Sequence, residues 1–260
     1  MKESLRLEIL ERLEGQPGRI GFYYRNLVSG EEIRYQDDME MMAASVIKLY
    51  IMAAAFDLME RGELDGEQTI AVRKEDYVPS CGALAYLHEG ILVTVMDLIT
   101  LMIIFSDNTA TNILIDLLGM EKINRSVRRL GYEKAALRRK MYDWEKADQG
   151  IQNRITAGET GRLFQELWQG TLVGRDASEK MLSILKNQQL NGKIPFYLQA
   201  LPGEPVIAHK TGEDTGITHD VGIVYGREPF VVCFCGNETD TPSYERVMAE
   251  LSLKLYQFLT

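Results

Sequence analysis

The chain has 260 residues, 45% of them hydrophobic, an ordinary globular composition for one large domain or two closely joined ones. Its 38 acidic residues outnumber its 29 lysines and arginines and give a net charge of -9. This charge argues against nucleic acid and anionic membrane surfaces as partners, because both bind basic proteins. The composition does not indicate which small molecule the protein binds.

The first predicted element, over residues 2–14, is a charged amphipathic helix that lacks the unbroken apolar stretch of a signal peptide. No stretch approaches the roughly 18 apolar residues of a membrane-spanning helix. The three cysteines are too few to imply a disulfide framework, and they favour a reducing compartment. We expect a soluble monomer that is cytoplasmic as the chain stands, or secreted if a leader precedes it.

Residues 18–36 predict two strands joined by a turn, and a block of helices follows them. The run 45–61 is hydrophobic on all sides, which is typical of a helix buried within the fold. The run 94–97 has the form of a capping box at the start of the next helix. Gly119 is placed to end a later helix, and Asp176 to cap the start of another.

Strand patterns return only near the end of the chain. Three β-rich runs precede a last helix over residues 243–259, and they are 205–212, 219–226 and 230–237. Strands that occur apart from the helices favour an α+β fold over alternating βαβ units. We expect one five-stranded antiparallel sheet that is built from both ends of the chain and flanked by the terminal helices.

An all-helical subdomain is then inserted between the two parts of this sheet. We place the sheet subdomain at about residues 1–42 and 200–260, and the helical subdomain at about residues 43–199. Both belong to a single domain over residues 1–260. The chain contains no internal repeat and no low-complexity segment that would suggest another architecture.

A lysine stands in the most apolar of these helices. Lys48 lies three residues after Ser45 in the run SVIKLYIMAAAF, so that both side chains share one helix face. A desolvated lysine has a depressed pKa and can act as a base, and a serine at a helix N-terminus favours developing negative charge. The alternative is a lysine whose ammonium extends along the helix to water. The Ser-x-x-Lys spacing alone does not decide between them.

Two further short motifs follow along the chain. Ser106-Asp107-Asn108 begins a helix, where the simplest interpretation is a helix cap. Lys210-Thr211-Gly212 ends a β-rich run, where a polar turn is the simplest interpretation. The combination of all three motifs in this order is far more specific than any of them alone.

This set of motifs resembles the class A β-lactamases and penicillin-binding proteins, and the length and gaps are most similar to the class A β-lactamases. The resemblance extends from about residue 18 to the C-terminus. It implies a β-lactamase/transpeptidase-like fold and a serine hydrolase that forms an acyl-enzyme, without a metal or a cofactor. The implied substrate is a β-lactam or a related acyl amide or ester.

The resemblance also implies roles for the first two motifs. Ser45 would be the nucleophile, and Lys48 the base or the relay that takes its proton. Ser106 would pass a proton to the leaving nitrogen. Asn108 would position the substrate amide together with Lys48.

The third motif implies a substrate-binding strand. In Lys210-Thr211-Gly212 the first two residues would bind the carboxylate of the substrate, and Lys210 would add positive potential. The backbone N–H groups of Ser45 and Glu213 would form the oxyanion hole.

The resemblance is incomplete in the loop over residues 137–156. Class A enzymes carry a glutamate there, two residues after an arginine, that activates the water for deacylation. In this chain Arg139 is followed by Lys140 and Met141. A shifted alignment places Glu145 at that position but loses the arginine. Glu145 is therefore a candidate base, and a solvated charge in a polar loop is its alternative.

Two alternatives to a β-lactamase with full turnover follow from this loop. A missing base predicts a penicillin-binding or sensor-type domain that is acylated and stays acylated. A promiscuous esterase would use the same serine and lysine. The Gly-x-Ser-x-Gly motif of α/β-hydrolases does not occur, and His88, His209 and His219 do not have the spacing of a metal site.

Overall fold

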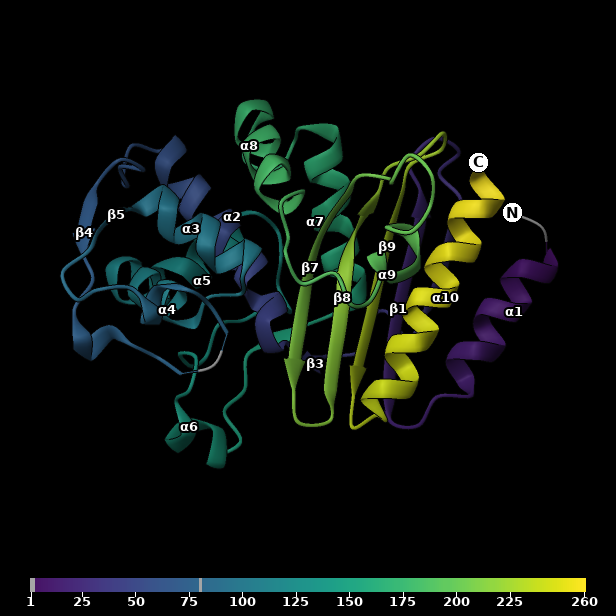
Figure 1. The fold of residues 1–260 in the computed structure, drawn as a ribbon, viewed down its shortest axis with the longest axis horizontal. Coiled ribbons are helices and arrows are strands. Elements are labelled where there is room, and N and C mark those ends of the chain that lie inside the picture. The colour runs from purple at the N-terminus through teal and green to yellow at the C-terminus, as the bar shows by residue number, and fades with distance from the viewer. Residues whose placement is uncertain (1–2, 80) are drawn as a thin grey trace.

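The computed structural model describes residues 3–79 and 81–260. Five strands from the two ends of the chain form one antiparallel sheet in the order β2-β1-β9-β8-β7 (Figure 1). These strands are β1 (Arg19–Asn26), β2 (Glu32–Tyr35), β7 (Ile207–Asp214), β8 (Ile217–Val224) and β9 (Phe230–Asn237). The predicted α+β class and the five-stranded sheet are confirmed.

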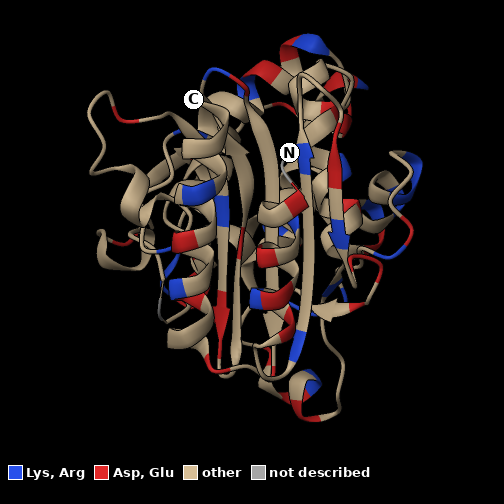
Figure 2. Cartoon of the chain, turned by 90° about the vertical axis from the view of Figure 1, so that its right-hand side faces the viewer, with Lys and Arg blue, Asp and Glu red and all other residues tan. Residues whose placement is uncertain are grey.

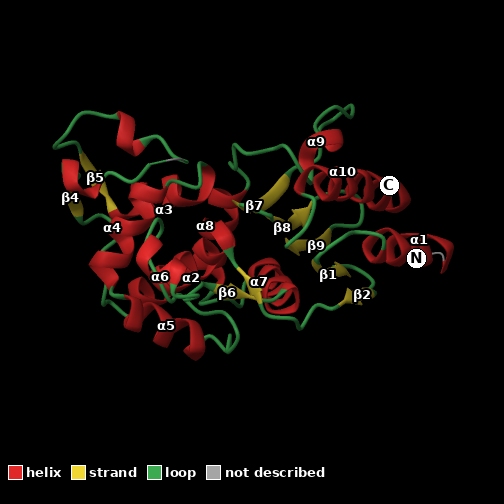
Figure 3. Cartoon of the chain, turned by 90° about the horizontal axis from the view of Figure 1, so that it is seen from below, coloured by secondary structure: helices red, strands yellow, loops and turns green. Residues whose placement is uncertain are grey.

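One face of the sheet is covered by the two terminal helices, α1 (Glu3–Glu14) and α10 (Thr241–Leu259) (Figures 1 and 3). Apolar side chains of both helices and of this face of the strands form one buried cluster. Acidic and basic residues are interspersed along α1 and α10 (Figure 2), and two ion pairs join the helices, Arg12–Glu250 and Glu8–Lys254. Such partly exposed pairs contribute little, so the buried apolar contact holds the helices on the sheet.

The opposite face of the sheet packs against α7 (Ala157–Gln169) (Figure 3). Gly161 lies where α7 contacts β1, and a Cβ atom at this position would lie only 2.1 Å from Tyr23 Cδ1. A glycine is required there, because any side chain would push the helix away from the sheet. The buried apolar cluster on this side continues into the helical part of the chain.

The helical part surrounds α2 (Ile47–Glu60), whose residues are buried as far as Leu58. The helices packed around it are α3 (Val95–Ile104), α4 (Asn108–Leu118), α5 (Met120–Arg129) and α8 (Arg175–Leu185). Two short helices are α6 (Trp144–Asp148) and α9 (Pro195–Leu198). Two short strand pairs were not expected: β3 (Met41–Met42) with β6 (Arg154–Ile155), and β4 (Thr69–Ala71) with β5 (Leu92–Thr94). The boundaries of the two subdomains stay a prediction.

The helix ends test the predicted capping signals. Thr94 Oγ1 accepts from Asp97 N at 3.0 Å and the Asp97 carboxylate accepts from Thr94 N at 2.8 Å, a reciprocal capping box at the start of α3. Gly119 ends α4. The prediction for Asp176 is wrong, because Gly174 caps α8 and Asp176 lies inside its first turn. A carboxylate still stabilises the helix dipole from that position.

Two of the cysteines lie in the core of the sheet. Cys233 and Cys235 are buried on β9, and burial raises the pKa of both thiols, which keeps them protonated and unreactive. Within residues 3–79 and 81–260 the structure contains no disulfide. Over the same residues no helix is both long enough and apolar enough to cross a membrane.

Candidate active site

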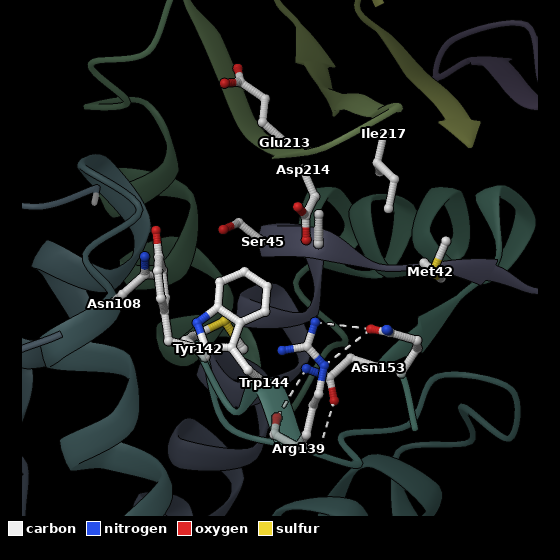
Figure 4. Close-up of a pocket in the computed structure, with 13 residues that line it drawn as sticks. Met42, Ser45, Asn108, Arg139, Tyr142, Trp144, Asn153, Glu213, Asp214 and Ile217 are labelled. Carbon is white, nitrogen blue, oxygen red and sulfur yellow. Dashed lines mark hydrogen bonds between the residues drawn. The ribbon is translucent and has the colours of Figure 1, made fainter. Parts of the chain in front are cut away.

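Ser45 lies in a 3₁₀ turn, Ala44–Val46, that leads directly into α2. Ala44 has a φ of 41°, a left-handed conformation that residues with a Cβ rarely adopt. The turn lies against β7 and lines a pocket (Figure 4). Ser45 therefore sits at the N-terminal end of its helix, as the sequence predicts.

Lys48 lies in the first turn of α2 and is completely buried. Its Nζ donates to Ser106 O at 2.8 Å, to Ser106 Oγ at 3.1 Å and to Asn108 Oδ1 at 2.8 Å. Burial lowers the pKa of Lys48 from 10.5 to about 7, against the opposite effects of Cys81 and Asp107. The ammonium does not extend to water, and Lys48 is balanced between its charged and neutral forms near neutral pH.

The Ser106-Asp107-Asn108 segment connects α3 to α4. Ser106 adopts a left-handed conformation with a φ of 54°. Asp107 is the N-cap of α4, and its Oδ2 atom accepts from the backbone N–H groups of Ala83 and Leu84, each at 2.8 Å. The capping interpretation of the motif is thus right for Asp107. Its two neighbours instead face the buried ammonium described above.

Lys210 reaches the same hydroxyl from the sheet. It is completely buried on β7, and its Nζ donates to Ser106 Oγ at 3.0 Å and to Thr211 O at 2.7 Å. Burial, followed by repulsion from Lys48, lowers the pKa of Lys210 well below its usual value. Ser106 Oγ therefore lies between two lysine nitrogens that come from different parts of the fold.

Gly212 lets β7 approach the turn that carries Ser45. A Cβ atom on Gly212 would lie 3.0 Å from Val46 Cγ2 and 3.3 Å from Ala43 O. Both contacts are tight, and one of them is to a backbone atom that cannot rotate away. The third residue of the motif is therefore needed for the packing that holds strand and serine together.

Glu213 lines the pocket, but its carboxylate points away from Ser45 (Figure 4). It forms an ion pair with Lys193 Nζ at 2.9 Å. Lys193 is only 3% exposed and also donates to His219 O at 3.3 Å. No motif in the sequence pointed to Lys193, because its partners come from distant parts of the chain.

The pocket in front of Ser45 has a volume of about 380 Å³, which suits a small molecule. It is bounded by the turn of Ser45, by the end of β7, and by the loop over residues 139–153 (Figure 4). The lining residues from this loop are Arg139, Met141, Tyr142, Trp144, Gln152 and Asn153.

Met141 is fixed in the wall of the pocket through its backbone. Asn112, on α4, donates from Nδ2 to Met141 O at 2.9 Å and accepts from Met141 N at 2.9 Å. This two-point contact fixes Met141 in the lining of the pocket that Asn108 and Ser45 also line. The residue at that position is a methionine, which has no proton to exchange.

The acidic residues of the loop do not line the pocket. Glu145 lies in α6 with an exposed side chain, Asp143 caps that helix, and Asp148 ends it. The two acidic residues that do line the pocket, Glu213 and Asp214, come from β7. The candidate base Glu145 is therefore not brought to the serine in this structure.

The histidines lie outside this pocket. His209 Nδ1 is 2.8 Å from Asp220 Oδ1 in the interior of the sheet. Burial lowers the pKa of His219 to about 4, so this imidazole is neutral at pH 7. Among the described residues no group of three or more His, Cys, Asp and Glu side chains is arranged to hold a metal ion.

The sequence profile described as the beta-lactamase enzyme family matches residues 4–259. A β-lactamase of Streptomyces fradiae is 27% identical and covers 87% of this chain and 76% of its own. The ROB-1 β-lactamase of Haemophilus influenzae is 27% identical, and the match covers 95% of this chain and 82% of that enzyme. The β-lactamase regulatory protein BlaB of Streptomyces cacaoi is 30% identical over 62% of this chain and 55% of its own, so the chain matches about half of that relative.

Solved structures share the fold over nearly the full chain. A β-lactamase from Sphaerobacter thermophilus has a TM-score of 0.88 and 30% identity, and the match covers 100% of this chain and 98% of that one. The structure of a protein named PBP-A has a TM-score of 0.86 and 25% identity, and the match covers 98% of this chain and 96% of that one.

The lowered pKa of Lys48 predicts how stability depends on pH. Between about pH 7 and pH 10.5 the folded protein binds fewer protons at Lys48 than the unfolded chain, so the free energy of unfolding rises with pH there. In urea unfolding at pH 6 to 9, the free energy of unfolding of the native protein should rise relative to that of the Lys48→Met variant. The difference should grow by up to about 1.4 kcal/mol per pH unit above pH 7.

The exposed Lys180 provides the matched control. The difference between the native protein and Lys180→Met should not change with pH. A constant difference for Lys48→Met as well would mean that Lys48 keeps an ordinary pKa.

Proposed function

Because the chain belongs to the beta-lactamase enzyme family, we propose that it is a class A-like serine hydrolase that opens β-lactam rings through an acyl-enzyme on Ser45. The observation that carries the proposal is the position of Ser106 Oγ, 3.1 Å from Lys48 Nζ and 3.0 Å from Lys210 Nζ, next to the pocket of Ser45. Burying two lysines around one hydroxyl is unfavourable for stability, and it supplies both a base and a positive potential.

Acylation begins with attack of Ser45 Oγ on the carbonyl carbon of the substrate amide. Lys48 accepts the proton of Ser45 in its neutral form, which is substantially populated at neutral pH because its pKa is about 7. A neutral amine has only two N–H groups and one lone pair. When Lys48 is neutral, Nζ keeps two of its three donated hydrogen bonds and has one lone pair, and Ser45 Oγ must come within reach of that lone pair for the transfer.

The C–N bond then breaks and the leaving nitrogen must take up a proton. Ser106 is placed to donate its hydroxyl proton and to recover one from Lys48, since their side chains are hydrogen-bonded. The backbone N–H groups of Ser45 and Glu213 would stabilise the charge on the carbonyl oxygen. This sequence conserves the proton that Ser45 released and leaves the acyl group on Ser45 Oγ.

Substrate binding falls to the residues at the two sides of the serine. Lys210 and Thr211 would hold the substrate carboxylate, with the ammonium of Lys210 as the source of attraction. Asn108 would hold the amide of the acyl side chain. All of these residues belong to one chain, so we propose that a monomer is sufficient for activity.

The loop over residues 139–153 brings no evident base for deacylation into this pocket. The residue that Asn112 holds in the pocket wall is Met141, and Glu145 is exposed outside it. Losing a well-placed general base typically slows a step by about 10²–10⁴-fold. We therefore propose that acylation outruns deacylation and that β-lactamase turnover is weak.

The same observation favours a second candidate, a penicillin-binding or sensor-type domain that keeps its acyl group. One relative is named a β-lactamase regulatory protein, and a solved structure of a PBP-A variant is described as an acyl-enzyme complex with penicillin G. Both candidates share the acylation step. The rate of deacylation separates them.

The first test concerns the nucleophile. Incubation with benzylpenicillin, followed by intact mass spectrometry, should show an adduct with the mass of the whole penicillin, because ring opening expels no fragment. Ser45→Ala should show none, while Ser183→Ala, at an exposed position on α8, should react at the native rate. An adduct that persists in Ser45→Ala would mean that another residue is the nucleophile.

The second test concerns the missing base. Met141→Glu would place a carboxylate in the pocket wall at a backbone position that Asn112 already fixes. We expect deacylation of the penicilloyl adduct to accelerate by about 10²-fold or more, as measured by the decay of the adduct after removal of free penicillin. Met141→Gln, which has a similar size but no basic oxygen, should decay like the native protein.

Glu145→Gln tests the alternative in the same assay. If the native protein turns over quickly and Glu145→Gln stalls as a stable adduct, Glu145 is the base and the proposal of a missing base fails.

A further inference from the structure

Arg139 presents an incompletely used guanidinium to the pocket. Figure 4 shows the side chain rising from the loop toward the middle of the pocket, beside Trp144. Its Nε and Nη2 atoms donate to Gln152 Oε1 at 3.1 and 2.9 Å, and Nη1 donates to Lys140 O at 3.3 Å. A guanidinium has five N–H groups, and these contacts use three. Among the described residues nothing accepts from the other two.

The charge of Arg139 is also not neutralised by the protein. Both of its acceptors, an amide oxygen and a backbone carbonyl, are uncharged, and no carboxylate of the described chain lies within ion-pair distance of it. The side chain is half-buried, so water shields it less than it shields a surface arginine. A partly desolvated guanidinium with two free donors favours binding of an anion, above all a planar carboxylate.

The surroundings make the pocket attractive to anions despite the net charge of -9 on the chain. Lys48 and Lys210 both donate to Ser106 Oγ next to the pocket, and the carboxylate of Glu213 is paired with Lys193. Of the described acidic residues that line the pocket, this leaves Asp214, which comes from β7, across the pocket from the loop that carries Arg139.

An apolar surface lies beside the guanidinium. The rings of Trp144 and Tyr142 meet edge to face with centroids 5.3 Å apart, and both line the pocket. Trp144 is 57% exposed, which is unusual for so large an apolar side chain. Rings next to a cation suit a substituent with an apolar stem and an anionic end.

We propose that Arg139 forms an anion subsite that binds a carboxylate on the acyl side chain of the substrate. This inference rests on the proposed function and deepens it. Lys210 and Thr211 would hold the carboxylate on the leaving-group side of the scissile amide. Arg139, on the opposite wall of the pocket, would hold the carboxylate on the acyl side. The substrate class is therefore an acyl donor with carboxylates on both sides of the reacting carbonyl.

The test uses pairs of probes that differ by one carboxylate. One pair is carbenicillin, which carries an α-carboxyl group on its side chain, and benzylpenicillin, which does not. The other pair is a cephalosporin with a glutaryl side chain and the methyl ester of that side chain. The glutaryl carboxylate lies further from the amide than the carboxylate of carbenicillin. For each probe the second-order rate constant of adduct formation is measured by intact mass spectrometry, and the ratio within each pair is compared between variants.

In Arg139→Gln the ratio of the carboxylated to the uncharged probe should fall at least about tenfold in one or both pairs, the usual effect of losing a charge-assisted hydrogen bond. Arg139→Lys should restore part of the ratio, because it keeps the charge without the planar fork. Arg138→Gln, an exposed neighbour, should leave the ratio unchanged.

Ratios that stay the same in Arg139→Gln for both pairs would overturn the inference. An equal loss of rate for charged and uncharged probes would overturn it as well, because Arg139 would then only tie the loop together through Gln152 and Lys140. If no probe forms an adduct with the native protein, the proposed function itself fails, which is a different result from unchanged ratios.

Discussion

The site depends on two buried lysines that share one hydroxyl. Lys48 Nζ and Lys210 Nζ lie 3.1 Å and 3.0 Å from Ser106 Oγ, so the two nitrogens are at most about 6 Å apart. Two positive charges at that distance repel by about 3 kcal/mol at an effective dielectric constant of about 20, and burial adds to this cost. Burial lowers the pKa of both lysines, and repulsion from Lys48 lowers the pKa of Lys210 further. The lowered pKa of Lys48 is thus a consequence of its complete burial in the packed interior.

The fold is arranged to maintain this unfavourable contact. Three residues with a Cβ, Ala44, Ser106 and Tyr142, adopt left-handed conformations beside the site, and such strain persists only where the surroundings enforce it. Asp107 enforces it on one side by capping α4 and binding the backbone of residues 83 and 84. Gly212 enforces it on the other by allowing β7 to touch the turn of Ser45. The helical part and the sheet therefore meet at the two buried lysines.

Sequence patterns predicted the parts of this account that are local. Periodicity and turn signals gave the α+β class and the strands, and three short motifs pointed to the residues that the structure brings together at Ser106. Contacts between distant segments were not predictable. No sequence pattern predicted the ion pair of Lys193 with Glu213 or the hydrogen bonds between Asn112 and Met141. Both contacts depend on which strand or helix packs nearby. The choice between Met141 and Glu145 was left open for the same reason, and the uncompensated charge of Arg139 was missed.

The rate of acylation as a function of pH tests the central claim most directly. If a neutral Lys48 removes the proton of Ser45, the rate constant for adduct formation with benzylpenicillin should rise with pH and level off above an apparent pKa near 7. Lys48→Met should remain folded and form no adduct at any pH. A rate that is constant from about pH 5.5 to 9, or a Lys48→Met variant that is acylated at the native rate, would contradict the account.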